Sequence, residues 1–575
     1  MILLLAGELY TQVIDQIILS GEMEFKRSDY LAWTKISEGS RLIDRDTILK
    51  NISLGLSEQG YFNPGLKVAY LPGQDSQRVN LSLDIIEGEP TRINSIILRG
   101  GDSTSNLMFS AKLEFLRGDI LKKSELENNI IEIIEYYEDE GFPFAGVKIN
   151  SIYFFEDTVT YKPLADIYLS IDTGRTSRID KIEISGNEKT KDFVILRDIG
   201  IKEGQYYSQK NIDEIPKQLN RLRFFEPVEN PTFYFNSGDE GVLVINVKEK
   251  QTNNFDGLVG YVPGNNLSEK AYVTGLVNVS LRNLFGTARA AAFKWQRLDR
   301  YSQELDIRYL EPWIGGYPFN IGIELFQLKQ DTTYVQRRLE GTVEFLATEN
   351  ISASVIVSTE SVIPSESENS VFTVYNSSII NTGFNLKIDT RDDYYAPTEG
   401  FYFLNSYTFS RKKINGPAQY LSQLTERNLN FQKFAVDFNY FRAVFKRNII
   451  AVGLHGREIR GSILELSDLF RLGGTNSLRG YRENQFLGNR ILWGNLEYRV
   501  LLSARTYAFA FFDMGYYLRD EDTMRKIPEA AGTKHGWGLG LNLETGLGVL
   551  GVSYALGKGD SFSSGKIHFG LINEF

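Results

Sequence analysis

The sequence predicts an α+β region built from three similar units, followed by an all-β transmembrane antiparallel barrel of about 16 strands. Two patterns predict this fold class. β-Rich runs that end in glycine recur at similar intervals before residue 250, and from residue 253 onward apolar and polar residues alternate with a period of two. The composition is typical of many long strands, because 13% of the 575 residues are aromatic and glycine (51 residues) far outnumbers proline (15 residues).

The charge balance and the cysteine and histidine counts exclude several classes of site. With 63 Lys+Arg against 73 Asp+Glu, the formal net charge of −10 argues against a nucleic-acid-binding protein. The chain has no cysteine, so it can form no disulfide, thiolate nucleophile, thiolate zinc site or iron–sulfur cluster. Its three histidines, His455, His535 and His568, lie far apart in the sequence, and we predict no catalytic residue, no metal and no cofactor. No apolar run reaches the roughly 18 residues of a membrane-spanning helix.

The N-terminus permits two interpretations. Residues 1–7 are apolar, but they are short for the core of a signal peptide and no basic segment precedes them. They are either the remnant of a signal peptide or the start of a buried strand, and we do not infer export from them.

Three similar segments occupy the first 250 residues. Each begins with a β-rich run that ends in glycine, and a second glycine follows 18 residues after the first. The runs lie at residues 13–21, 92–100 and 178–186, and the second glycines are Gly39, Gly118 and Gly204. A helical stretch follows, clearest at residues 121–137, where apolar residues recur at helical spacing and Ser124 is a candidate N-cap. Each segment closes with an extended run, at residues 79–86, 165–171 and 241–248.

The segments repeat after 79 and then 86 residues, which is the size of a small domain rather than of a solenoid repeat. Three unrelated α+β units that match by chance are the alternative, but the identical glycine spacing disfavours it. The unit resembles the POTRA (polypeptide-transport-associated) domain, a strand–helix–helix–strand–strand module. The resemblance implies POTRA domains at residues 8–90, 91–176 and 177–252, with the barrel at residues 253–575.

Residues 253–575 alternate between apolar and polar or charged side chains. Leu305, Ile307 and Tyr309 alternate with charged residues, and the pattern recurs at residues 434–440 and 492–500. A soluble β-sandwich would show this alternation too. A membrane barrel is favoured because no helical pattern interrupts the strands and because charge sits on the presumed inner face. At roughly 20 residues for each strand and its connection, the region holds about 16 strands.

The most specific motif is the glycine-rich stretch at residues 472–483, which reads Leu-Gly-Gly-Thr-Asn-Ser-Leu-Arg-Gly-Tyr-Arg-Glu. By itself it is a polar loop between two strands. It resembles the lumen loop of the BamA/TamA outer-membrane assembly family, in which an Arg-Gly-aromatic tip folds back into the barrel. Arg479, Gly480 and Tyr481 would form that tip. A guanidinium in a narrow lumen requires a carboxylate partner, since an unpaired buried charge is costly.

The resemblance implies two acidic partners for Arg479 on neighbouring strands. Glu497 alternates with apolar Leu496 and Tyr498, so its inward direction follows from the sequence. Asp513 has apolar neighbours on both faces, and its inward direction is implied by the resemblance alone. We expect Arg479 to bridge the two acids and to lock the loop in the lumen.

Other segments resemble the family in the same order along the chain. They lie at residues 283–287, 309–313, 389–392 with 397–400, and 538–552. The chain ends on Phe575, as many outer-membrane barrels do. The resemblance implies that the first strand, near residues 256–261, pairs with the last, near residues 566–575. Gly257, Gly260 and Gly570 would weaken this seam, whose last residue is Phe575.

The resemblance implies an outer-membrane assembly factor that is not an enzyme and whose POTRA domains lie in the periplasm. Its partners would be membrane lipid and unfolded outer-membrane or autotransporter polypeptides, received at POTRA sheet edges by β-augmentation and inserted through the seam. Three repeats match TamA-like members, which implies an inner-membrane-anchored partner. Two alternatives stay open: a two-partner-type secretion pore, and a passive channel with periplasmic docking domains. An enzyme barrel is disfavoured, because no Ser/His/Asp grouping is evident.

Overall fold

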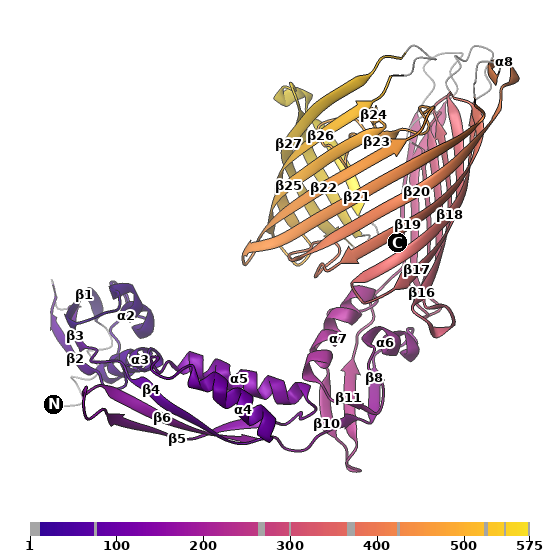
Figure 1. Ribbon diagram of the computed structural model, residues 1–575. Coiled ribbons are helices and arrows are strands. Elements are labelled where there is room, and N and C mark those ends of the chain that lie inside the picture. Colours follow the sequence, from indigo (N-terminus) through magenta and orange to yellow (C-terminus); the bar gives the residue numbers. More distant parts are fainter. Residues whose placement is uncertain are drawn as a thin grey trace. The chain divides into compact units, whose positions relative to one another are not determined.

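The computed structural model (Figure 1) describes residues 12–73, 77–262, 271–297, 301–364, 374–421, 426–521, 527–545 and 548–572. The chain divides into two compact units. One contains Met1–Glu183, Ile201–Asp213 and Pro231–Val244, and the other contains Ile184–Gly200, Glu214–Asn230 and Ile245–Phe575. The division runs through the third of the three repeats, whose residues contribute to both units.

The first repeat combines a three-stranded sheet with two helices. Its elements are β1 (Val13–Glu22), α2 (Arg27–Thr34), α3 (Arg45–Glu58), β2 (Gly65–Pro72) and β3 (Arg78–Ile86). The sheet order is β1-β3-β2, in which β1 runs parallel and β2 antiparallel to β3. Ile48, Ile52 and Leu56 recur every four residues and therefore share one face of α3. This face packs in a common core with Leu81 and Leu83 of β3.

The second and third repeats reuse this plan. The second contains β4 (Arg92–Gly100), α4 (Ser103–Glu114), α5 (Lys123–Asp139), β5 (Gly146–Glu156) and β6 (Pro163–Asp172), in the sheet order β4-β6-β5. The third contains β7 (Arg178–Ile179), β8 (Lys181–Ser185), α6 (Asp192–Ile199), β9 (Gln205–Tyr206), α7 (Gln209–Leu222), β10 (Thr232–Phe235) and β11 (Gly241–Asn246), in the sheet order β10-β11-β8 with a separate β7-β9 pair. The prediction of Ser124 as a cap is wrong, because α5 starts at Lys123 and Lys122 occupies the N-cap position.

Two glycine positions explain the equal spacing in the three repeats. A Cβ on the glycine that ends the first strand would lie 2.0, 2.3 or 1.8 Å from a backbone carbonyl oxygen, at Gly21, Gly100 and Gly186 respectively. The second glycine donates its N–H back to the first strand: Gly39 to Ile14 at 2.8 Å, Gly118 to Ile93 at 2.8 Å and Gly204 to Ile179 at 2.7 Å. All six glycines have a positive φ, which other residues rarely adopt. The spacing therefore reflects one loop that returns to the same point of the first strand.

The remaining long strands form one 16-stranded sheet, which confirms the predicted fold class. In order they are β12 (Asn254–Val262), β13 (Tyr272–Leu284), β14 (Arg289–Arg297), β15 (Gln303–Glu311), β16 (Phe319–Gln330), β17 (Tyr334–Leu346), β18 (Ile351–Pro364), β19 (Asn376–Asp389), β20 (Gly400–Gly416), β21 (Asn428–Phe445), β22 (Asn448–Arg460), β25 (Arg490–Leu501), β26 (Tyr507–Arg519), β27 (Ala530–Thr545), β28 (Gly548–Gly557) and β29 (Lys566–Ile572). Each neighbouring pair is antiparallel, and the sheet curves into a barrel in Figure 1. Shorter elements are η1 (Ile314–Gly316), α8 (Ala418–Leu421), β23 (Phe470–Leu472), β24 (Phe486–Gly488) and η2 (Phe562–Ser564).

The two faces of the barrel sheet differ in chemistry. In β25, Leu496 and Tyr498 are 50% and 46% exposed, whereas Glu497 between them is turned to the other face. That second face carries ion pairs between strands, including Lys294–Glu304 at 2.8 Å. Alternation with a period of two therefore separates an apolar outer surface from a charged lumen. In the described parts of the chain, no helix is both long and apolar enough to cross a membrane.

The predicted seam lies at the two ends of the sheet order. Gly257 and Gly260 belong to β12, and Gly570 belongs to β29. Among the residues that the structure describes, no ladder pairs β12 with β29. Phe575 lies outside the described residues. The weak seam therefore stays a prediction.

Candidate functional site

The candidate site is built on the loop at residues 473–485, which joins β23 to β24 within the long connection between β22 and β25. Gly473 and Gly474 turn the chain, with φ values of +117° and +104°. The N–H of Gly473 donates to Oγ of Ser477 at 2.9 Å, and the N–H of Gly474 donates to the carbonyl of Leu478 at 3.1 Å. These local bonds present the Arg-Gly-Tyr sequence at the tip of the loop.

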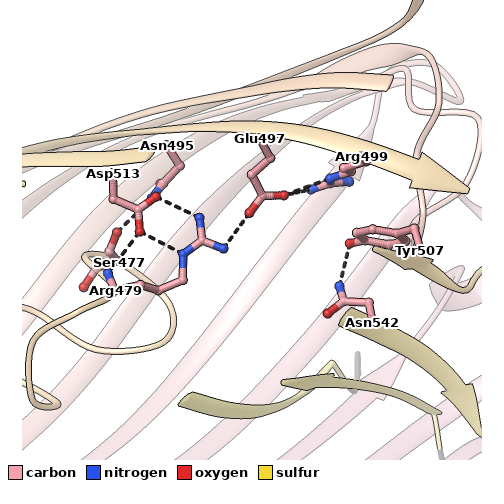
Figure 2. A network of polar contacts seen from close by, with 8 residues as sticks. All are labelled: Ser477, Arg479, Asn495, Glu497, Arg499, Tyr507, Asp513 and Asn542. Carbon is pink, nitrogen blue, oxygen red and sulfur yellow. Dashed lines mark hydrogen bonds and ion pairs between the residues drawn. The ribbon is translucent and has the colours of Figure 1, made fainter. Parts of the chain in front are cut away.

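The structure brings Arg479 of the tip together with Glu497 of β25 and Asp513 of β26 (Figure 2). The guanidinium donates twice to Asp513, from Nε to Oδ2 at 2.8 Å and from Nη2 to Oδ1 at 2.7 Å. Its Nη1 donates to Oε1 of Glu497 at 2.7 Å. The backbone N–H of Arg479 adds a fourth bond, to Oδ2 of Asp513 at 3.0 Å. The barrel wall therefore binds both the side chain and the main chain of the tip. Hydrogen bonds between charged groups are among the strongest in proteins, so we expect this contact to be firm.

Two more side chains complete this network. Asn495 donates its Nδ2 to Oδ1 of Asp513 at 2.8 Å, and Arg499 donates its Nε to Oε2 of Glu497 at 2.8 Å. Two guanidinium groups therefore face two carboxylates, and the network is neutral. Asp513 is 0% exposed, and in this network its charge is compensated, as burial of a carboxylate requires.

Gly480 and Tyr481 bring the tip against the last strands of the barrel. The N–H of Gly480 donates to Nε2 of His568 in β29 at 3.0 Å. A Cβ at Gly480, where φ is +91°, would lie 2.7 Å from the backbone nitrogen of Gly557, so the close approach requires glycine. The hydroxyl of Tyr481 donates to the carbonyl of His535 in β27 at 2.9 Å.

The sequence interpretation missed the partners of the tip in the last three strands. Gly536 and Gly557 lie directly opposite each other in the β27–β28 ladder, and together they leave room for the loop backbone. The sequence gives His568 no histidine partner, because His455 and His535 lie far from it along the chain. The signal in the sequence is the recurrence of glycine at residues 536, 538 and 540, which removes the side chains from one face of a strand.

A substitution in β27 tests whether the tip rests on this strand. A Cβ on Gly536 would lie 2.0 Å from the carbonyl oxygen of Arg479, whereas a Cβ on Gly532 of the same strand would meet only the ring of Tyr517 at 3.4 Å or more. We expect Gly536→Ala to lower the free energy of unfolding by about 1–3 kcal/mol through overpacking. Gly532→Ala is the matched control. Urea unfolding of both variants in lipid vesicles measures the difference, and equal stability would contradict the packing.

A second ionic cluster anchors the segment that precedes the loop. Nζ of Lys412 in β20 lies 2.7 Å from Oδ2 of Asp468 and 2.6 Å from Oε2 of Glu465, and all three side chains are almost completely buried. Oε1 of Glu465 accepts the backbone N–H of Tyr375 at 2.7 Å. The cluster lies beside a buried apolar core that contains Tyr375, Ile414, Leu429, Phe431 and Ile459. The carboxylates belong to the connection and the cation to the wall, which is the reverse of the arrangement at Arg479.

The connection between β22 and β25 also reaches the opposite wall of the barrel. Arg471 of β23 donates to Oε1 of Gln330 in β16 at 2.9 Å and to the hydroxyl of Tyr334 in β17 at 2.7 Å. The tip, by contrast, touches β26 to β29. In the 16-stranded order these contacts lie on opposite sides, so the connection crosses the lumen. A cavity of about 1180 Å³ lies beside it, lined by β13 to β17, the loop and β29.

Within the described residues, no group of three or more His, Cys, Asp or Glu side chains is placed to hold a metal ion. What the arrangement can do is mechanical, because a charged loop tip is bound at once to β25 and β26 and to the last strand of the sheet.

A family model described as the Omp85 superfamily domain matches residues 283–575, which is half of the chain and includes the whole site. The chain belongs to the Omp85 superfamily. A second model, POTRA, described as a surface antigen variable number repeat, matches residues 177–250. The resemblance to the BamA/TamA type of outer-membrane protein is thereby confirmed.

Relatives of this Omp85 protein include outer membrane protein assembly factors named BamA. The one from Nitratidesulfovibrio vulgaris is 23% identical over 499 residues, which cover 76% of this chain and 56% of the relative. The one from Neorickettsia risticii is 22% identical over 520 residues, which cover 84% of this chain and 66% of the relative. The chain thus spans between about half and two thirds of the length of these two relatives.

A solved structure supports the fold. The crystal structure of BamA from Haemophilus ducreyi lacking POTRA domains 1–3 matches with a TM-score of 0.50 and 17% identity, over 83% of this chain and 98% of that one. This Omp85 protein is an outer-membrane protein with POTRA domains in the periplasm.

Proposed function

We propose that this Omp85 protein inserts unfolded outer-membrane polypeptides into the outer membrane. The observation that carries the proposal is the loop tip, which Arg479 binds to the lumen wall and which reaches β29 through Gly480. A bound loop that crosses the lumen disfavours free diffusion through it, and contact with the last strand favours action at the seam. The relatives named as assembly factors support the same activity.

The lock made by Arg479, Glu497 and Asp513 keeps the loop inside the lumen. Its four bonds leave the guanidinium and Asp513 with little freedom, and such a preorganised contact has two states, bound and released. Gly480 and Tyr481 then set where the tip meets the last strands.

Unfolded substrate binds at open edges of the POTRA sheets. β2 and β5 are outer strands of their sheets. The opposite edges already carry bridges, from Val13 to Arg41 at β1 and from Arg92 to Ile120 at β4. β-Augmentation at β2 or β5 uses main-chain bonds and therefore tolerates many substrate sequences. Tyr153 of β5 is 62% exposed and offers an apolar contact beside the edge.

The seam between β12 and β29 is the site of insertion. Gly257, Gly260 and Gly570 contribute no side chains to it, so its pairing is weak. A substrate strand that pairs there enters lipid with its main-chain groups already bonded. The folding free energy of the substrate drives the step, in keeping with a sequence that contains no nucleotide-binding P-loop. The protein therefore acts without catalysing a covalent reaction.

The partners follow from the same proposal. They are membrane lipid, unfolded outer-membrane proteins with autotransporters favoured among them, and an inner-membrane-anchored protein that the three repeats favour. None of these partners is a nucleic acid, consistent with the net charge of −10.

Reconstitution in liposomes tests the proposal. An unfolded model barrel protein is added to vesicles with and without this protein, and its protease-resistant, membrane-inserted fraction is followed over time. We expect faster insertion with the protein present. Delivery of a polypeptide into the vesicle interior would instead favour a secretion pore, and a large steady conductance without insertion would favour a passive channel.

A further inference from the structure

His568 connects the loop tip to the last strand of the sheet. Its Nε2 accepts the N–H of Gly480 at 3.0 Å, and its Nδ1 lies 3.4 Å from Oγ1 of Thr475. The side chain is 7% exposed, while its neighbours Ile567 and Phe569 are exposed on the other face of β29. The ring therefore points into the lumen, toward the loop.

The hydrogen bond defines the charge of this histidine. A backbone N–H can only donate, so Nε2 must be the unprotonated nitrogen and the proton must sit on Nδ1. His568 is thus neutral when the tip is bound. An imidazolium would carry hydrogens on both nitrogens and could no longer accept the N–H of Gly480.

The contact joins strands that are not neighbours. Arg479 binds β26 through Asp513, and the adjacent Gly480 binds β29 through His568. The tip thereby links β26 to β29 from the lumen side, across β27 and β28. The other edge of β29 faces the predicted seam, where the described residues contain no ladder to β12. Within the described residues, β29 is held by the ladder to β28, by the ion pair between Lys566 and Asp560, and by this loop contact.

We propose that His568 is a positioning residue that holds the seam strand to the lumen loop in its neutral form and releases it on protonation. Unperturbed imidazole titrates near pH 6.5, and burial of this ring opposes its charged form, so release requires a pH below that value. This inference rests on the proposed function, which assigns insertion to the seam. It adds a residue that regulates the seam.

Charged side chains from each element that packs against His568 surround its ring. Arg479 and Glu483 lie on the loop, Asp513 on β26 and Lys566 on β29 itself. Lys566 is paired with Asp560 through a bond of 2.5 Å. Burial of the ring opposes its protonation most, the positive charges of Arg479 and Lys566 also oppose it, and the carboxylates of Glu483 and Asp513 favour it. The loss of the acceptor at Nε2 follows from protonation whatever this balance is.

Hydrogen–deuterium exchange of β29 in the full chain, reconstituted in lipid, tests the inference. We compare protection of residues 566–572 at about pH 7.5 and about pH 5.5, after correction for intrinsic exchange rates. We expect protection of β29, relative to β19, which contains no histidine, to fall by about tenfold at the lower pH, the size of effect expected for one net hydrogen bond. His568→Phe should lower the protection of β29 by a similar factor at both pH values.

A conservative replacement of His568 separates a pH-dependent role from a merely structural one. His568→Gln retains an uncharged acceptor, so we expect β29 to stay protected at both pH values. His455→Gln is the matched control, because His455 lies on β22 and pairs with Asp437 at 2.7 Å, away from the tip. It should leave the pH dependence of β29 unchanged.

Two outcomes would overturn the inference: protection of β29 that does not depend on pH in the natural protein, or a pH dependence that persists in His568→Gln. The exchange measurement does not require insertion activity. If exchange follows the expected pattern while the liposome assay detects no insertion, the coupling stands and the proposed function fails.

Discussion

Arg479→Ala is expected to lower the free energy of unfolding of the barrel by about 3–5 kcal/mol, the usual cost of removing one partner from a buried ionic network. The substitution leaves Asp513 completely buried and without the guanidinium that donates to both of its oxygens. Glu497 keeps only Arg499. Urea unfolding in lipid vesicles measures the loss, and the liposome assay should show slower insertion by the same variant.

The matched control lies on the same loop. Arg482 is exposed, and its backbone N–H, not its guanidinium, donates to Oε1 of Gln485 at 2.9 Å. Arg482→Ala should therefore change stability by less than about 0.5 kcal/mol, as is usual for a surface substitution. Arg479→Lys should fall between the two, because an ammonium keeps the charge but cannot make two parallel bonds to one carboxylate. Normal stability and insertion by Arg479→Ala would contradict the lock.

Lys412→Met is expected to have an effect of similar size, about 3–5 kcal/mol, for a related reason. The methionine has a similar volume but leaves Glu465 and Asp468 buried without their shared cation. Because these carboxylates belong to the connection that crosses the lumen, the segment before β23 should detach from the wall. Faster proteolysis of this segment in intact vesicles measures the detachment.

Two further variants make this result specific. Lys413 is the next residue on β20 and is exposed, so Lys413→Met should have little effect. The triple variant Lys412→Met, Glu465→Gln, Asp468→Asn removes all three charges and should recover part of the lost stability, since a buried polar cluster without ions avoids the unpaired charge. If the triple variant were less stable than Lys412→Met, the unpaired carboxylates would not be the cause.

The local sequence pattern was enough to predict the three repeats and the inward orientation of the Glu497 side chain. The 18-residue glycine spacing reflects a loop that returns to the same carbonyl of the first strand, which is a property of short segments. Glu497 is turned inward because Leu496 and Tyr498 beside it face outward, and a strand has only two faces.

The same reasoning could not orient Asp513. Phe511 on the same inner face is also apolar, because it lies under the loop, with the guanidinium of Arg479 at 3.7 Å from its ring centroid. Where the loop fills the lumen, the inner face of β26 packs against the loop instead of facing water. Apolar residues then occur on both faces of the strand, and the alternation of apolar and polar residues is lost at the site. The family resemblance supplied the direction that periodicity could not.

The amino-acid sequence by itself determined the three glycine-bounded α+β repeats, the amphipathic alternation of the barrel strands and the presence of a glycine-rich Arg-Gly-Tyr loop. Only the tertiary structure decided which walls that loop meets: His568 and Gly536 at one end, and Lys412 at the other. The physical reason is range. Periodicity and backbone conformation are set by neighbouring residues, whereas these contacts join residues 56 to 88 positions apart and form only when the barrel has curved around the loop.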